Sequence, residues 1–324
     1  FQMLPFRRPG EDHDGLLVHQ MDEEEQASWL SLFEFRDDVW QRSFEVRLPP
    51  DLNLFDIAGT PSGDVILGYA GQTLLAFDLE DLAFEPVFAM PSMFRGPEHS
   101  GFGRVNVTHD VNGDGLDDVA LAHFDGWQLA LQEPPDVPSG PDALSDAPAG
   151  PFAPIFSKPS LVGPSALPSY TVEEFGLCES RDCLSHQLYF RAQSIYRLDE
   201  NLDGRIDIAF WDDGVFKVHR QTADGDFEPT AVDLETPLSG VYDAYLSLTI
   251  GEPSEEEEAR QGVLGEVLDL NADGYVDLVV FVLVGEGVFG QKTSHEIHYG
   301  RPGAGGTLEF DAEPTAVIAS DNIQ

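Results

Sequence analysis

Three short stretches of this sequence bring oxygen-bearing side chains together at a fixed spacing. Each follows the pattern D-x-N-x-D-G-x-x-D. Acids and amides at positions 1, 3 and 5, followed by a glycine that permits a sharp turn at position 6, curl a loop around a hard cation such as Ca²⁺. Position 7 then offers its main-chain carbonyl, and position 9 offers another carboxylate. The predicted ligands of the three loops are Asp110, Asn112, Asp114, Leu116 and Asp118; Asp199, Asn201, Asp203, Arg205 and Asp207; and Asp269, Asn271, Asp273, Tyr275 and Asp277.

An acidic turn without a cation is the alternative interpretation of any single copy, because Asp and Asn favour such turns. Three copies that all keep the ninth-position acid favour a cation site, since a turn does not need that acid. The loops are not EF-hands, because position 12, where an EF-hand carries Glu, holds Leu121, Phe210 and Val280. Apolar runs that predict buried strands follow each loop. We expect about three Ca²⁺ ions, one for each complete loop.

The segments around these loops repeat as a unit. After each loop the sequence predicts a strand, a hairpin turn, a third strand and a fourth strand marked by a proline such as Pro229 or Pro314. Asp56–Asp64 occupies the loop position of a degenerate copy, and Asp22–Ser28 that of an earlier one whose first strand begins at Gly15. Tandem four-stranded units are typical of a β-propeller, in which each unit is one blade. The predicted fold is all-β, a propeller with about five visible blades and calcium loops between strands 1 and 2; tandem β-sandwiches are the alternative.

The repeat boundaries follow from these units. Residues 1–12 are expected to form an N-terminal extension, and residues 13–318 the propeller repeats. The predicted blades span 13–48, 49–95, 100–158, 185–235 and 245–318, with an insertion at 159–184. Residues 319–324 are expected to start a further repeat or to form a tail. Unless five blades close the ring, we expect the native polypeptide to continue.

Composition narrows the class of protein. A hydrophobic fraction of 42% in 324 residues predicts a globular chain with a sizeable core. The net charge of −42 argues against a nucleic-acid partner, because phosphate binding needs a basic face and Lys and Arg together number only 17. No run reaches the ~18 apolar residues of a membrane-spanning helix.

The two cysteines, Cys178 and Cys183, form a C-x₄-C arrangement. Their even number and close spacing favour a small-loop disulfide in an oxidising compartment, and two free thiols are the alternative. A zinc site is not expected, since no pair of histidines lies near them.

The sequence resembles the FG-GAP/VCBS repeat family, the repeats of integrin α-subunit propellers and of many bacterial secreted and surface proteins. The closest copy has Gly101-Phe102-Gly103 ahead of its loop. It departs from the family at His123-Phe124, where the usual turn is missing, and the copies at Asp199 and Asp269 lack the leading Phe-Gly. The resemblance implies a Ca²⁺-stabilised propeller of an extracellular, cell-surface or periplasmic protein, with its metal loops on one face.

No catalytic motif stands out. The sequence lacks G-x-S-x-G, P-loop and H-E-x-x-H patterns, and its one G-x-G-x-x-G, starting at Gly285, has no helical pattern after it. Trp127 and Trp211 lie beside hairpin turns and are candidates for a glycan-binding surface, with packing between blades as the alternative. We therefore predict a non-enzymatic protein that binds a protein or glycan partner outside the cytoplasm. The alternatives are the propeller domain of a secreted hydrolase or lyase, and a structural subunit of an extracellular assembly or filament.

Overall fold

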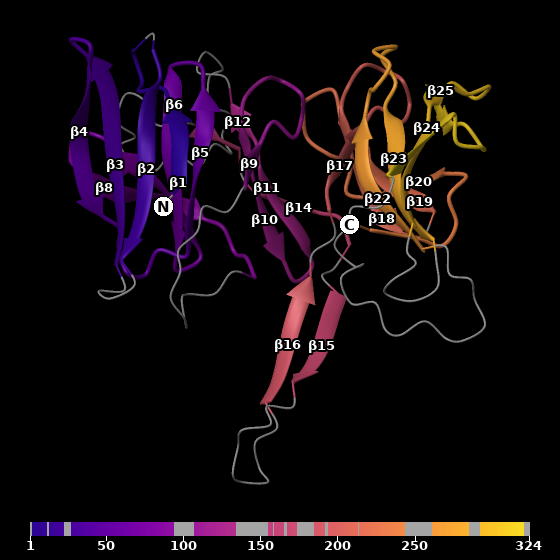
Figure 1. Ribbon diagram of the computed structural model, residues 1–324, viewed down its shortest axis with the longest axis horizontal. Helices are drawn as coiled ribbons and strands as arrows, with labels where there is room; N and C mark the ends of the chain where they lie inside the picture. The colour runs from indigo at the N-terminus through magenta and orange to yellow at the C-terminus, as the bar shows by residue number, and fades with distance from the viewer. Residues whose placement is uncertain are drawn as a thin grey trace. The chain divides into compact units, whose positions relative to one another are not determined.

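The computed structural model consists of β-strands joined by turns and loops (Figure 1). It describes residues 2–11, 13–22, 27–93, 107–133, 155–157, 159–164, 167–173, 185–191, 194–212, 214–243, 261–284 and 292–320. The chain divides into two compact units, Phe1–Leu161 and Val162–Gln324, and each is described by itself. None of the described residues belongs to a helix long and apolar enough to cross a membrane.

The first unit contains three four-stranded sheets, with the strand orders β1-β2-β3-β4, β5-β6-β7-β8 and β14-β11-β10-β9. Neighbouring strands of the first two sheets are antiparallel. A two-stranded pair, β12-β13, accompanies the third. The strands are β1 (Gln2–Phe6), β2 (Gly15–Asp22), β3 (Ala27–Arg36), β4 (Val39–Arg47), β5 (Leu54–Thr60), β6 (Gly63–Ala70), β7 (Thr73–Asp78), β8 (Ala83–Ala89), β9 (Thr108–His109), β10 (Asp118–His123), β11 (Gly126–Ala130), β12 (Gln132–Glu133), β13 (Ile155–Phe156) and β14 (Ser160–Val162).

The second unit contains a four-stranded antiparallel sheet, β17-β18-β19-β20, and a five-stranded sheet, β21-β22-β23-β24-β27. In the five-stranded sheet β21 is parallel to β22, and the other pairs are antiparallel. Two hairpins, β15-β16 and β25-β26, lie outside these sheets. The strands are β15 (Leu167–Glu173), β16 (Ser185–Arg191), β17 (Tyr196–Leu198), β18 (Asp207–Asp212), β19 (Val215–His219), β20 (Val232–Glu235), β21 (Val241–Asp243), β22 (Gln261–Leu268), β23 (Asp277–Val284), β24 (Lys292–His298), β25 (Gly300–Pro302), β26 (Leu308–Phe310) and β27 (Ala316–Ser320).

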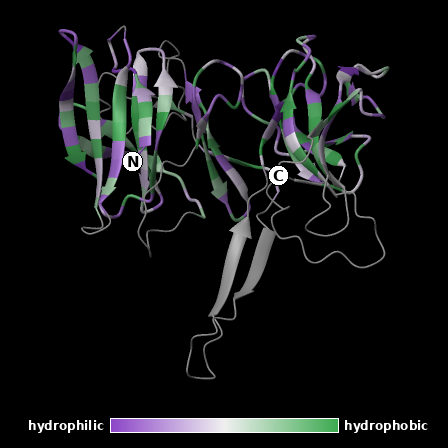
Figure 2. Cartoon of the chain, in the orientation of Figure 1, coloured by the Kyte–Doolittle hydropathy of each residue, from purple (hydrophilic) through white to green (hydrophobic). Residues whose placement is uncertain are grey.

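Successive sheets within a unit share hydrophobic cores. One core joins the first and second sheets around Leu32 and Phe55, and another joins the second and third around Leu67 and Leu121. In the second unit a third core joins the two large sheets around Phe216. The strands after the first two acidic loops, β10 and β18, are buried on both faces, and hydrophobic residues are coloured green in Figure 2. The prediction of an all-β protein built from repeated four-stranded sheets is confirmed.

The first sheet begins earlier in the chain than the sequence suggested. β1 lies within the predicted extension at 1–12 and pairs with β2. Apolar Leu4 and Phe6 face the core while Met3 and Pro5 do not, which is the alternation of a strand with one buried face. As a result Asp22–Ser28 joins the second strand to the third, rather than the first to the second.

Asp56–Asp64 is not a loop. β5 continues to Thr60, and β6 starts at Gly63 after a tight turn. The Asp56 carboxylate is fully buried, where Oδ2 accepts hydrogen bonds from the backbone N–H groups of Val107 and Thr108 at 2.8 and 3.0 Å. Asp56 therefore joins the second sheet to the third, a structural use that explains an acid inside a strand.

The fourth strands also differ from the predicted units. β14, the fourth strand of the third sheet, lies inside the predicted insertion at 159–184, and β27 extends past residue 318. Pro229 and Pro314 precede β20 and β27 instead of lying within them, since proline has no N–H to donate to a neighbouring strand.

Candidate metal-binding loops

Each acidic loop joins two neighbouring antiparallel strands of one sheet: β9 and β10, β17 and β18, and β22 and β23. In each loop the residues at positions 4 and 6 have a positive φ. These are Gly113 (80°) and Gly115 (87°), Leu202 (56°) and Gly204 (86°), and Ala272 (59°) and Gly274 (92°). The left-handed conformation costs a residue with a side chain about 1–2 kcal/mol. Contacts within the loop must therefore hold Leu202 and Ala272 in a conformation that they do not prefer.

Side chains at positions 1, 3 and 5 supply those contacts. In the third loop, Asp269 accepts a hydrogen bond from the N–H of Gly274 at 2.8 Å, and Asn271 accepts one from the N–H of Asp273 at 2.9 Å. Asp273 in turn accepts one from the N–H of Tyr275 at 2.9 Å. The same bonds recur in the first loop and in the second. In all three loops the amide of the asparagine also donates to the carboxylate at position 5.

The acid at position 9 accepts hydrogen bonds from backbone N–H groups, and these bonds could not be predicted from the sequence pattern. Asp118, Asp207 and Asp277 are 0%, 1% and 0% exposed. In each loop one carboxylate oxygen of the ninth-position acid accepts a hydrogen bond of 2.9 Å from the backbone N–H at position 2. The other oxygen accepts one from a backbone N–H just beyond the third strand, that of Gln132 (2.7 Å), Gln221 (2.8 Å) or Gly300 (2.9 Å). This acid closes the loop and anchors it to the sheet.

The carboxylates within a loop repel one another. Burial raises the pKa of Asp118 to about 7, against the effect of its backbone hydrogen bonds, and the charge of Asp114 adds to the rise. Burial likewise raises the pKa of Asp207 to about 6, and the charges of Asp199 and Asp203 contribute. A cation bound among these groups would favour their ionised forms.

The second loop contains a cation of its own. The guanidinium of Arg205, at position 7, forms an ion pair with Asp203, and its Nε donates to the carbonyl of Gln221 at 3.0 Å. Slight burial acts to raise the pKa of Asp203, but hydrogen bonds from Arg205 and Asn201 and the charge of Arg205 outweigh it, and the pKa is lowered. Leu116 and Tyr275 hold this position in the other loops.

The donor atoms suit a hard cation, because the predicted side-chain ligands carry oxygen donors and include neither His nor Cys. Within the described residues no group of three or more His, Cys, Asp and Glu side chains is arranged to hold a metal ion. Both oxygens of the ninth-position acid are engaged, one by a backbone N–H of the loop and the other by a backbone N–H beyond it in the chain. The donors that each loop leaves toward solvent are therefore the side chains of positions 1, 3 and 5 and the carbonyl of position 7.

Trp211 is wrongly assigned as a candidate for a glycan-binding surface. It is 2% exposed, donates from Nε1 to the carbonyl of Val241 at 2.8 Å, and packs edge-on against Phe216. Packing within the core, the alternative interpretation, holds for this residue.

Other predicted features fall on parts of the chain outside the described residues. These are Cys178 and Cys183, Gly101-Phe102-Gly103 and the glycine pattern that starts at Gly285. The disulfide therefore stays a prediction.

Comparison with known proteins gives no family assignment. No protein-family model matches the chain, and no curated protein is significantly similar to it. The geometry defines an all-β protein of repeated β-sheets of four or five strands, and three of these sheets carry an acidic loop of one conformation.

Proposed function

We propose that this protein is a Ca²⁺-binding β-propeller of the FG-GAP/VCBS type. It acts outside the cytoplasm, has no catalytic activity, and binds a protein or glycan partner. The observation that carries the proposal is the shared geometry of the three loops, which have the same left-handed positions and the same hydrogen bonds. Backbone strain of this kind is characteristic of ligand-binding sites.

The loops keep this geometry although their other residues differ. Position 2 is buried Val111 in the first loop, buried Glu200 in the second, and exposed Leu270 in the third. Packing around the loops therefore does not explain their common conformation. The shared residues, Asp, Asn, Asp and Gly, hold it through their own hydrogen bonds, and the same side chains are the oxygen donors that a Ca²⁺ site needs.

Ca²⁺ would stabilise the folded chain. Each ion would be held by the side chains at positions 1, 3 and 5 of one loop and by the carbonyl of Leu116, Arg205 or Tyr275. The ninth-position acid, which is buried and bonded to backbone N–H groups, would support the loop. An ion that binds only the folded state at 100 times its dissociation constant adds about 2.7 kcal/mol to the free energy of unfolding. Successive sheets that share hydrophobic cores support the propeller. The proposed location follows from the proposed ion, because Ca²⁺ outside the cell is abundant enough to fill sites of modest affinity.

Thermal unfolding in Ca²⁺ and in chelator tests this proposal. We expect Ca²⁺ to raise the melting temperature of the native chain, and to lose that effect in a triple variant, Asp114→Ala with Asp203→Ala and Asp273→Ala. Because any divalent cation screens so acidic a protein, Mg²⁺ at the same ionic strength is the control. An equal rise with Mg²⁺, or an undiminished rise in the triple variant, would refute the proposal.

A further inference from the structure

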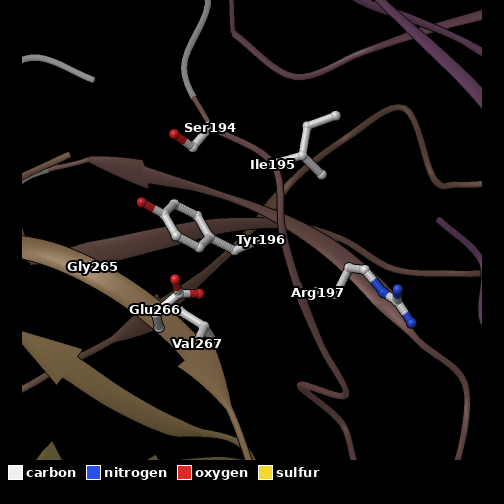
Figure 3. A pocket seen from close by; sticks show the side chains of 7 residues that line it. All are labelled: Ser194, Ile195, Tyr196, Arg197, Gly265, Glu266 and Val267. Carbon is white, nitrogen blue, oxygen red and sulfur yellow. The ribbon is translucent and has the colours of Figure 1, made fainter. Parts of the chain in front are cut away.

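A pocket of about 300 Å³ lies between strands of the two large sheets of the second unit (Figure 3). Its walls come from the chain around β17 and from β22, and its lining residues are Ser194, Ile195, Tyr196, Arg197, Gly265, Glu266 and Val267. It is separate from the donor side chains of the acidic loops. No sequence motif marks this pocket, because its two walls are about 70 residues apart in the chain.

An irregularity of β22 forms one wall. Its pairing with β23 shifts register between Leu264 and Glu266, which leaves Gly265 as the extra residue of a bulge. Within the described residues, the parallel pairing of β21 with β22 includes Asp243 opposite Leu264, the residue just before the bulge. The bulge lies within the segment Gly265–Val267 that lines the pocket.

The charge that faces the pocket is negative. In Figure 3 the carboxylate of Glu266 lies beside the ring of Tyr196, while the guanidinium of Arg197 points away from both. In the described part of the chain Glu266 makes no ion pair and no hydrogen bond. The Tyr196 ring is held in place by the core, where it packs edge-on against Phe216 with 5.6 Å between ring centroids.

We propose that this pocket binds an organic cation, the ammonium or guanidinium group of a Lys or Arg side chain on a partner protein. An unpaired carboxylate beside a fixed aromatic ring suits such a group, because the carboxylate pairs with the charge and the ring attracts it through its π face. The apolar side chains of Ile195 and Val267 suit the methylene stem that carries the charge. The net charge of −42 draws basic partners to the molecule.

The proposal makes the partner of the proposed function a protein with a basic segment, and it does not require filled Ca²⁺ loops. The test is an NMR titration of protein labelled with ¹⁵N-glycine, using Nα-acetyl-lysine amide as the probe and excess Ca²⁺ to occupy the acidic loops. The reporter is the Gly265 amide, assigned through Gly265→Ala, whose added Cβ meets only the Val279 carbonyl at 3.4 Å. Nα-acetyl-norleucine amide, which lacks the charge, is the neutral control.

We expect the Gly265 signal to shift in a saturable way with the lysine probe, and Glu266→Gln to weaken binding about fivefold or more, as for a charge-assisted hydrogen bond. The matched control Glu85→Gln, an exposed glutamate of β8 in the other unit, should leave the affinity unchanged. No shift at Gly265, equal binding of the norleucine probe, or unchanged affinity in Glu266→Gln would overturn the proposal. Because Ca²⁺ binding is measured separately by melting, the two proposals fail independently.

Discussion

Arg205 distinguishes the second acidic loop from the other two, and its removal should tighten Ca²⁺ binding there. The side chains of the Arg205–Asp203 pair are 41% and 27% exposed, so the pair is partly solvated. It occupies the position-5 carboxylate that a cation would need. The perturbation we choose is Arg205→Gln, which removes the charge and keeps a polar side chain near the carbonyl of Gln221.

The size of the effect follows from the ion pair. A partly exposed pair of this kind contributes up to about 1 kcal/mol, and about 1.4 kcal/mol corresponds to a tenfold change in a binding constant. A Ca²⁺ ion that displaces the pair therefore loses about fivefold in affinity. Repulsion between the guanidinium and the ion acts in the same direction, so Arg205→Gln should tighten binding about fivefold or more.

Calorimetric titration measures this affinity when only the second loop is intact, in a background of Asp114→Ala and Asp273→Ala. The matched control is Arg42→Gln, which breaks the Arg42–Glu45 pair of the first sheet, with side chains 51% and 37% exposed. The control should leave the affinity unchanged. If Arg205→Gln binds Ca²⁺ no more tightly than its parent, the assignment of Asp203 as a ligand is wrong.

Three further predictions concern stability. The pKa of Asp118 is about 7 in the folded state and about 3.9 in the unfolded state, so the folded state binds one more proton between these pH values. Denaturant titrations in chelator should therefore show that the free energy of unfolding falls as the pH rises from about 4 to about 7. That slope should persist at high salt, because a buried carboxylate is little screened; a slope abolished by salt would assign it to surface charge. Gly115→Ala should destabilise the chain by about 1 kcal/mol through backbone strain alone, since no atom lies within 4 Å of the added Cβ. Ala272→Gly should not destabilise the chain, and a loss of stability in this variant would show that the positive φ is not the cause. Asp56→Ala should cost about 3 kcal/mol or more in chemical unfolding, because it leaves buried N–H groups without partners, whereas exposed Asp51→Ala should change stability by less than about 0.5 kcal/mol.

The loops and the strands after them could be predicted from the sequence because both are local. A glycine at position 6 permits a left-handed turn among the Asp and Asn residues, and a run such as Val119–Ala122 has no polar face to expose. Their order along the chain then fixes an all-β repeat. These signals come from adjacent residues, so they can be recognised before the fold is known.

The second role of the ninth-position acid could not be predicted, because it depends on residues far away in the chain. Asp277 accepts a hydrogen bond from Gly300, 23 residues later. Asp56 resembled a loop residue in the sequence for the same reason, since its partners at Val107 and Thr108 belong to the next sheet. The pocket beside Glu266 arises from a register shift, which no motif marks.

The most direct test of the account is the Ca²⁺ stoichiometry of the chelated, intact chain, measured by calorimetric titration. We predict about three ions, one for each loop, and the loss of about one in each of Asp114→Ala, Asp203→Ala and Asp273→Ala. Absence of Ca²⁺ binding, or a stoichiometry that none of the three substitutions changes, would contradict the account and leave the loops as acidic turns.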